Sequence, residues 1–150
     1  MNLENKIPPY VVAAICAFLM KVLTYLPPVL VFPRLVVVAI LLVLIGTAMG
    51  IAGLWAFRQA QTTIDPLNPE KTSHFVSNGV YHYTRNPMYV GVACFLAAWA
   101  VWLAHLLSWV GVLLFIAYIT RFQIVPEERV LKQKFGAEYD SYQQKVRRWL

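Results

Sequence analysis

Four long apolar stretches, separated by more polar segments, dominate the hydrophobic pattern of this chain. They run from about Tyr10 to Leu26, from Leu35 to Phe57, from Met88 to Leu107 and from Ser108 to Val125. Each is expected to form a membrane-spanning helix, and the second is long enough to cross a bilayer with some tilt. Because only His105 and Ser108 mark the turn between the last two stretches, these predict a tight helical hairpin.

Polar residues become frequent after Val125, and their pattern predicts an amphipathic helix. Pro126 suits a first helical position, and Glu127 and Glu128 then lie in a first turn, where the helix dipole favours carboxylates. Apolar residues follow at spacings of three and four, namely Leu131, Phe135, Tyr139, Tyr142, Val146 and Trp149. Gly136 is expected to divide this helix in two. Such a helix can lie on a membrane surface, and surface binding alone could be the whole role of the tail.

Composition places the chain in the membrane class. Hydrophobic residues make up 59% of its 150 residues and charged residues 13%, whereas soluble domains carry about 25% charged residues. The mean hydropathy of +0.58 agrees. We therefore expect an all-α, multi-pass integral membrane protein that forms a single domain over residues 1–150. Cys16 and Cys94 lie inside apolar stretches without metal-ligand spacing, which indicates buried small hydrophobes and no metal site.

The distribution of basic residues predicts the orientation in the membrane. Four spans put the N-terminus, the loop from Arg58 to Pro87 and the C-terminal tail on the same side. That side carries all of the 13 lysines and arginines except Arg34 and Lys21, and Lys21 is close enough to its helix end to snorkel outward. The positive-inside rule makes the basic side cytoplasmic. Because the net charge of +6 gathers beside apolar segments, the expected partner is an anionic membrane surface and not a nucleic acid.

A polar and aromatic segment, GVYHYTRNPMYVG, overlaps the start of the third apolar stretch. Asn86 is a good N-cap and Pro87 fits the first helical position, so the third span should begin here. The first N–H groups of a helix lack intrahelical partners, and Arg85 adjoins them, which predicts an anion site. Tyr81 and Tyr89 add aromatic faces that attract a cation. A ligand with a carboxylate and a cationic centre, such as S-adenosylmethionine, would suit this corner; interfacial tyrosines beside a helix cap are the alternative.

The segment VSNGVYHYTRNPMYVG, together with EERVLKQKFGAEYDSY in the tail, resembles the isoprenylcysteine carboxyl methyltransferase family and its relatives, the phospholipid methyltransferases. The shared pattern is G-x-Y, then R-H-P or R-N-P and x-Y-x-G, followed after a two-helix interval by E-E-x-x-L and F-G-x-x-Y-x-x-Y. All of these occur here in order. The resemblance covers about Thr62–Arg148 and implies an S-adenosylmethionine-dependent methyltransferase whose cofactor-binding part spans about residues 62–148.

The resemblance also implies a cofactor cleft between the cytoplasmic loop and the tail. The residues it implies for binding S-adenosylmethionine are Ser73, His74, Phe75, Val76, Tyr81, Asn86, Pro87, Met88, Tyr89 and Glu127. The helix-start argument supports residues 86–89 independently. Arg85 and Glu127 are the candidate catalytic residues. Arg85 adjoins the predicted anion site, and Glu127 can accept hydrogen bonds from the cofactor's ammonium or ribose hydroxyls. Glu128 is expected to matter less if it points to solvent.

The methyl acceptor is expected to be lipophilic and to arrive from the bilayer. The resemblance implies an isoprenylcysteine carboxylate, with a phospholipid amine or a thiol as alternatives. In the prenylcysteine enzymes an arginine four residues before the glutamate of this motif looks like the partner of the acceptor carboxylate. Here that position is Gln123, which offers donors but no charge. Arg121, the nearest cation, lies roughly 160° round an ideal helix from Gln123. We therefore hypothesise a neutral or amine-bearing lipid or a lipophilic thiol, with Gln123 and Arg121 as candidate acceptor residues.

Two other classes of protein are compatible with the sequence. Membrane reductases of the sterol type are similar at their C-terminal end and use a nicotinamide cofactor. They are usually much longer, and the extra phosphate of that cofactor should demand more arginines than Arg85 and Arg121. The other class is a non-catalytic membrane module that binds a lipid or a partner. A titration with S-adenosylmethionine that releases no heat would favour the non-catalytic module.

Overall fold

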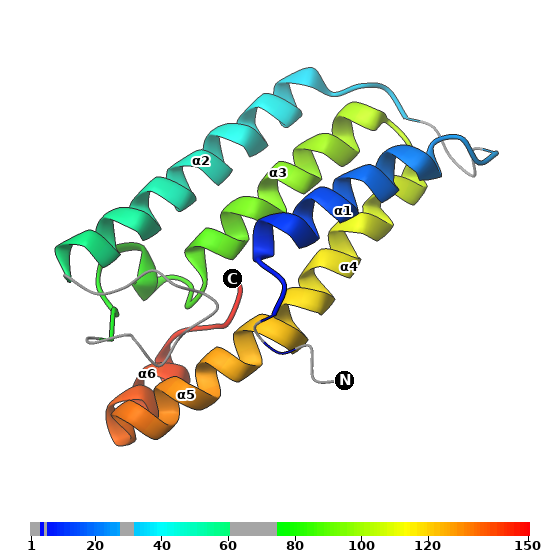
Figure 1. Ribbon diagram of the computed structural model, residues 1–150. Coiled ribbons are helices and arrows are strands. Elements are labelled where there is room, and N and C mark those ends of the chain that lie inside the picture. Colours follow the sequence, from blue (N-terminus) through cyan, green and yellow to red (C-terminus); the bar gives the residue numbers. More distant parts are fainter. Residues whose placement is uncertain (1–3, 5, 28–31, 61–74) are drawn as a thin grey trace.

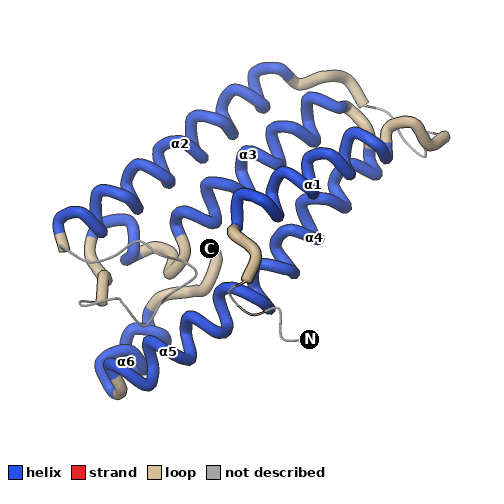
Figure 2. The backbone as a smooth tube through the Cα atoms, in the orientation of Figure 1, coloured by secondary structure: helices blue, strands red, loops and turns tan. Residues whose placement is uncertain are grey.

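The computed structural model describes residues 4, 6–27, 32–60 and 75–150, and its secondary structure there confirms the all-α prediction. The helices are α1 (Pro9–Leu23), α2 (Val36–Gln59), α3 (Pro87–Leu103), α4 (Trp109–Ile119), α5 (Val125–Phe135) and α6 (Ala137–Lys145). Short 3-10 turns lie at Gly79–His82 and Leu106–Ser108, and a π-helical turn lies at Thr120–Ile124. Helices α1 to α4 lie alongside one another and alternate in direction, while α5 and α6 lie at one end of this bundle (Figures 1 and 2).

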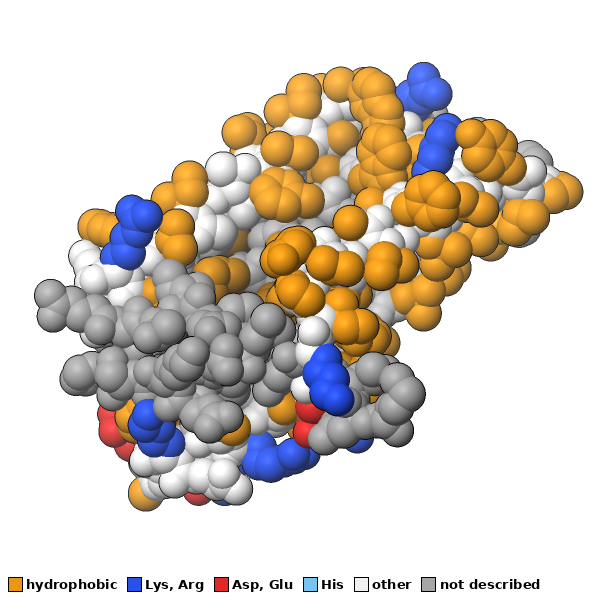
Figure 3. Space-filling view, in the orientation of Figure 1, with side chains coloured by type: hydrophobic (Ala, Val, Ile, Leu, Met, Phe, Trp, Pro, Cys, Tyr) orange, Lys and Arg blue, Asp and Glu red, His pale blue; other side chains and the backbone are white. Residues whose placement is uncertain are grey.

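Helix α2 and the continuous helix Leu106–Phe135 are long and apolar enough to cross a membrane. Helices α1 and α3 are also apolar but shorter, with 15 and 17 residues. Large hydrophobic side chains on α2 face outward; Val37, for example, is 71% exposed. Figure 3 shows hydrophobic side chains over the middle of this face and lysines and arginines towards its two ends. These features are consistent with an integral membrane protein, and the number of spans and their sidedness stay predictions.

Two helix ends differ from the predicted stretches. Helix α1 ends at Leu23 and not at Leu26, and a turn follows it. Helix α3 ends at Leu103 and not at Leu107, because Ala104 adopts a left-handed conformation with φ of +54° and ends the helix there. The 3-10 turn then leads directly into α4, so the predicted tight hairpin is confirmed.

The tail helix begins where Pro126 predicts it, since α5 starts at Val125 and Pro126 lies in its first turn, but α5 is not separate from the last apolar helix. Helix α4, the π turn and α5 form one continuous helix, and Pro126 lies inside it. A proline inside a helix lacks an N–H and its ring collides with the carbonyl four residues earlier. The π turn at Thr120–Ile124 widens the backbone directly before the proline and makes room for the ring. The predicted break at Gly136 is confirmed, since this glycine has φ of +51° between α5 and α6.

Glycines bring the helices into close contact. A Cβ atom on Gly46 of α2 would lie 2.8 Å from the backbone oxygen of Gly91 on α3, and a Cβ on Gly91 would lie 2.7 Å from the Gly46 oxygen. A Cβ on Gly111 of α4 would overlap the side chain of Met20 on α1. Small residues allow helix backbones to approach in this way where no hydrophobic effect drives association. These contacts seat α2 on α3 and α1 on α4.

The main core lies between α1, α3 and α4. Met20, Phe115 and Ile119 are completely buried there. The indole Nε1 of Trp99 on α3 donates to the backbone oxygen of Ala17 on α1 at 3.2 Å. Helix α2 packs against α3 and the turn at Gly79–His82, so it lies at the edge of the bundle with much of its surface facing outward.

Candidate functional site

The predicted start of the third span is confirmed in position but not in its capping bond. Asn86 is the N-cap and Pro87 is the first residue of α3. The Asn86 side chain makes no capping hydrogen bond, and its Nδ2 donates instead to the backbone oxygen of Arg148 at 2.9 Å. The first turn of α3 therefore presents its N–H groups and the positive end of its dipole without a capping bond from this side chain.

The C-terminal segment 146–150 returns from α6 to the start of α3 (Figure 1). The backbone N–H of Arg85 donates to the oxygen of Arg147 at 3.0 Å, and the Thr84 hydroxyl donates to the oxygen of Arg148 at 3.3 Å. Trp149 Nε1 donates to Thr120 Oγ1 at 3.0 Å, which attaches the same segment to the π turn. The end of the chain thus joins the loop before α3 to the long helix.

Glu128 binds two arginines and does not point to solvent. Its carboxylate accepts from Nε and Nη2 of Arg148 at 3.0 and 2.7 Å, and its Oε1 lies 2.9 Å from Nη1 of Arg85. Only 11% of the Glu128 side chain and 11% of the Arg85 side chain are exposed. The Arg85 contact is an ion pair without hydrogen-bond geometry, because Nε and Nη1 of Arg85 are buried and make no hydrogen bond within the described part of the chain. Glu128 was expected to matter less if it pointed to solvent, and its side chain is instead largely buried.

Gln123 and Glu127 lie one turn apart on the long helix and both meet Tyr89 of α3. The Tyr89 hydroxyl donates to the Glu127 carboxylate, and the Gln123 amide donates to the Tyr89 oxygen. Gln123 is 2% exposed. The Oε2 atom of Glu127 is buried and accepts no hydrogen bond from residues 4, 6–27, 32–60 or 75–150. A buried carboxylate oxygen is costly unless it is paired, so this atom is suited to a donor or a positive charge from a ligand.

Aromatic side chains border the corner between the start of α3, α5 and the C-terminal segment. The Phe75 ring packs edge-on against Tyr142 and Tyr139, with centroids 4.9 and 5.6 Å apart. The Tyr142 hydroxyl donates to the backbone oxygen of Tyr81 at 2.7 Å. Val76 and Tyr81 are both buried in one small apolar cluster against the end of α2. The tail helix α6 therefore holds the segment Phe75–Tyr81 in place through rings and one hydrogen bond.

Burial keeps two tyrosines of the loop and tail, Tyr81 and Tyr139, protonated at neutral pH. Burial, reinforced by the negative charge of Glu127, raises the pKa of Tyr81. Burial, together with the charge of Glu128, raises the pKa of Tyr139 to about 12. These phenols therefore offer hydrogen-bond donors and ring faces to a ligand, and neither serves as a base.

Two predicted site residues face away from this corner. The Arg121 side chain is 61% exposed and its Nη1 lies 3.4 Å from Oε1 of Glu4, whereas Gln123 is buried, as the helical angle between them predicts. Met88 faces α2, since a Cβ atom on Gly53 would lie 2.9 Å from its Cγ. The proposed roles of Arg121 and Met88 at the site thus lack geometric support.

Two other predicted cofactor residues, Ser73 and His74, lie outside the described residues. Conversely, Arg148 and Trp149 are parts of the site that the sequence motifs did not predict. Trp149 was noted only for its apolar spacing, and Arg148 only for its charge. The available cue is the arginine pair at positions 147 and 148, which follows the two tail helices that carry acidic residues and could therefore pair with them.

Comparisons with known proteins show the family to which the chain belongs. The family description "Phospholipid methyltransferase" matches residues 35–138, which is more than half of the chain. The chain belongs to the phospholipid methyltransferase family. This family consists of membrane methyltransferases that use S-adenosylmethionine as methyl donor, and the resemblance predicted from the two motifs is confirmed.

Individual relatives carry less specific information. An uncharacterized protein of Haemophilus influenzae is 52% identical over 63 residues, which cover 42% of this chain and 100% of that protein. Two proteins named "Probable protein-S-isoprenylcysteine O-methyltransferase", from Oryza sativa subsp. indica and subsp. japonica, are each 28% identical over 138 residues. These matches cover 88% of this chain and 72% of each rice protein. No solved structure matches the chain at a significant level.

Proposed function

We propose that this chain transfers a methyl group from S-adenosylmethionine to a lipophilic acceptor, in the corner between the start of α3, α5 and the C-terminal segment. The observation that carries the proposal is the buried Oε2 of Glu127, which has no hydrogen-bond partner among the described residues, beside the start of α3, which has no side-chain cap. The cofactor has a carboxylate, which suits the helix start, and an ammonium and ribose hydroxyls, which suit the Glu127 oxygen. Its sulfonium suits the faces of Tyr81 and Tyr89.

The protein's part in the reaction is positioning and exclusion of water. Bound S-adenosylmethionine would supply a methyl group on a positively charged sulfonium, open to displacement by a nucleophile. The chain's residues hold the acceptor in line and keep the site dry. A carboxylate or thiolate acceptor needs no further proton transfer, whereas an amine loses a proton to complete the exchange. Because Tyr81 and Tyr139 stay protonated, the first two kinds of acceptor need the least from this site.

We infer that the acceptor is a neutral or amine-bearing lipid or a lipophilic thiol, and not a prenylcysteine carboxylate. A buried carboxylate costs several kcal/mol unless it is paired. The position expected to pair it holds Gln123, a neutral residue that is 2% exposed. Arg85 is already bound to Glu128, and Arg121 faces Glu4 on the outside. The family description names a phospholipid and the names of the two rice relatives an isoprenylcysteine, so the comparisons do not decide between these acceptors.

Calorimetric titration of the purified protein with S-adenosylmethionine tests the cofactor site. Replacing Glu127 by glutamine removes a charge-assisted hydrogen bond worth about 1.5–3 kcal/mol, so Glu127→Gln should weaken binding roughly ten- to hundredfold. Glu138→Gln is the matched control, because this glutamate is exposed on α6. Equal affinity in the parent protein and Glu127→Gln would remove Glu127 from the site. No measurable heat in the folded parent would favour the non-catalytic module.

Competition between acceptors tests the acceptor assignment. One reaction would contain a prenylcysteine, phosphatidylethanolamine and a long-chain thiol, with labelled methyl donor, and each product would be counted. The parent should prefer the amine or the thiol, and Gln123→Arg should shift methylation towards the prenylcysteine carboxylate. Efficient methylation of the prenylcysteine by the parent, with no gain in Gln123→Arg, would contradict the hypothesis and support a carboxyl methyltransferase.

A further inference from the structure

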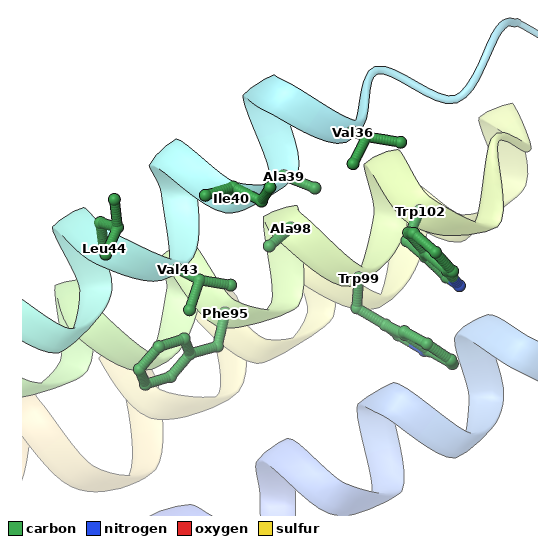
Figure 4. Close-up of a pocket in the computed structure, with 9 residues that line it drawn as sticks. All are labelled: Val36, Ala39, Ile40, Val43, Leu44, Phe95, Ala98, Trp99 and Trp102. Carbon is green, nitrogen blue, oxygen red and sulfur yellow. The ribbon is translucent and has the colours of Figure 1, made fainter.

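An apolar groove of about 410 Å³ lies between α2 and α3, near the end of the bundle where α2 begins and α3 ends (Figure 4). Its walls run from Val36 to Leu44 on α2 and from Phe95 to Trp102 on α3. The groove exists because Ala39 is small and faces the equally small Ala98, while larger side chains flank both. The eight helical steps from Val36 to Leu44 rise ~12 Å, close to the ~15 Å of hydrocarbon in one leaflet.

One end of this groove carries a positive charge. Arg34 precedes α2, is exposed, and places its guanidinium carbon 5.8 Å from the centre of the Trp102 ring. The backbone N–H of Phe32 donates to the oxygen of Ala104 at 3.3 Å, which ties this segment to the end of α3. Trp102 is thus both a wall of the groove and the surface on which Arg34 rests.

No acidic residue balances this charge at the same end. Lys21 and Arg34 are the only charged residues between Lys6 and Arg58, and the sequence from Asn86 to Thr120 has none. Both cations rest on aromatic rings, Lys21 at 5.3 Å from the centre of the Tyr25 ring. On the face drawn in Figure 3, lysines and arginines appear without acidic side chains at the end where α2 begins. An apolar groove with unbalanced cations at its mouth is complementary to an anionic amphiphile.

We propose that the groove and Arg34 form a binding site for one glycerophospholipid of the leaflet opposite the methyl-transfer corner. An acyl chain lies along α2 and α3, and the phosphate pairs with Arg34, whose fork of donors matches phosphate oxygens. Lys21 adds to the positive potential at this end of the bundle. The site is separate from the methyl-transfer corner, because Ala98 lies nine residues, ~14 Å, along α3 from Tyr89.

A second copy of this chain fits the groove less well than a lipid does. Two copies in one membrane have the same orientation, so a pair that met across this groove would bring two Arg34 side chains to the same depth. Like charges at an apolar interface oppose association, whereas a lipid phosphate neutralises the charge. The charge at the mouth therefore favours the lipid as occupant.

Native mass spectrometry of the delipidated protein in detergent tests the proposal. Phosphatidylglycerol is the probe, and diacylglycerol with the same acyl chains is the control that lacks the phosphate. We expect one phosphatidylglycerol retained per chain and severalfold weaker retention of diacylglycerol. Arg34→Gln should lower the affinity about fivefold, and Arg58→Gln at the other end of α2 should leave it unchanged.

A pair of tryptophan variants tests the groove itself. Val43→Trp fills the groove and should abolish retention of phosphatidylglycerol. Leu41→Trp introduces the same side chain at an exposed position of α2 that does not line the groove. Melting curves of both variants establish that they are folded. Equal retention of both lipids, or parent-like retention in Arg34→Gln and Val43→Trp, would overturn the proposal. A dimer that Val43→Trp dissociates would also overturn it, in favour of a second copy. None of these readouts involves methyl transfer, so they are independent of the proposed function.

Discussion

Replacing Glu128 by glutamine removes the charge that holds two arginines at the start of α3. The parent carboxylate makes three contacts of 2.7–3.0 Å with Arg85 and Arg148. A glutamine keeps one acceptor oxygen and turns a donor towards guanidinium groups that are themselves only donors. Glu128→Gln therefore removes the carboxylate that is paired with Arg85, whose side chain is only 11% exposed.

The size of the effect follows from the burial of these groups. Removing one partner of a buried ion pair costs about 3–5 kcal/mol. Arg148 is 37% exposed, and water can solvate it after the change, so the lower end of about 3 kcal/mol is the better value. For a chain of this length each kcal/mol lowers the melting temperature by about 2–4 °C, so Glu128→Gln should melt about 6–12 °C below the parent.

Tryptophan fluorescence during heating in detergent would measure this shift. The matched control is Lys132→Gln on the same helix, which breaks a 2.8 Å ion pair with Asp140 whose partners are 60% and 39% exposed. An exposed pair contributes about 0–1 kcal/mol, so the control should lose no more than about 4 °C. High salt should reduce only the control's difference from the parent, because exposed pairs are screened most. A Glu128→Gln protein that melts no lower than Lys132→Gln would refute the reasoning.

Three further predictions concern packing, backbone and orientation. Gly46→Ala should destabilise the fold by about 1–3 kcal/mol, because its Cβ would lie 2.8 Å from a backbone oxygen of α3. Gly50→Ala should have no such effect, because a Cβ at Gly50 would have nothing within 4 Å. Melting curves of the two variants compare them directly. Gly136→Ala should lower the melting temperature through strain at φ of +51°, about 1–3 kcal/mol, and parent-like melting would contradict this. In a cysteine-free background, an impermeant thiol reagent added to intact cells should label Tyr25→Cys and spare Ser141→Cys; the reverse result would overturn the predicted orientation.

Much of the fold could be predicted from sequence because it depends on local or one-dimensional properties. Apolar stretches long enough for a membrane reveal the helices, since a backbone in lipid must satisfy its own hydrogen bonds. The start of α3 at Asn86-Pro87 and the break at Gly136 follow from what those residue types do to the backbone nearby. The hairpin between α3 and α4 follows from the short interval between two apolar stretches.

The long helix shows where such local arguments fail. A proline is often an early residue of a helix, and Pro126 does lie in the first turn of α5, but the π turn before it joins α5 to α4 in one continuous helix. The Asn86 side chain is a good cap in isolation, but here its Nδ2 donates to the oxygen of Arg148, 62 residues away in the sequence, and the side chain makes no capping bond. Local preference was overridden in both cases by a partner or a distortion that appears only in the folded chain.

The sequence by itself determined the family, the membrane character and the residues gathered at the start of α3, because motifs and hydrophobic runs are written along the chain. The tertiary structure alone decided how those residues are used. It turned Glu128 inward to two arginines, placed Gln123 and Glu127 against Tyr89, and left one Glu127 oxygen buried with no partner in the part of the chain that the structure describes. The physical reason is that the charge and burial of a side chain depend on its neighbours in space, and here those neighbours come from the loop, the long helix and the end of the chain.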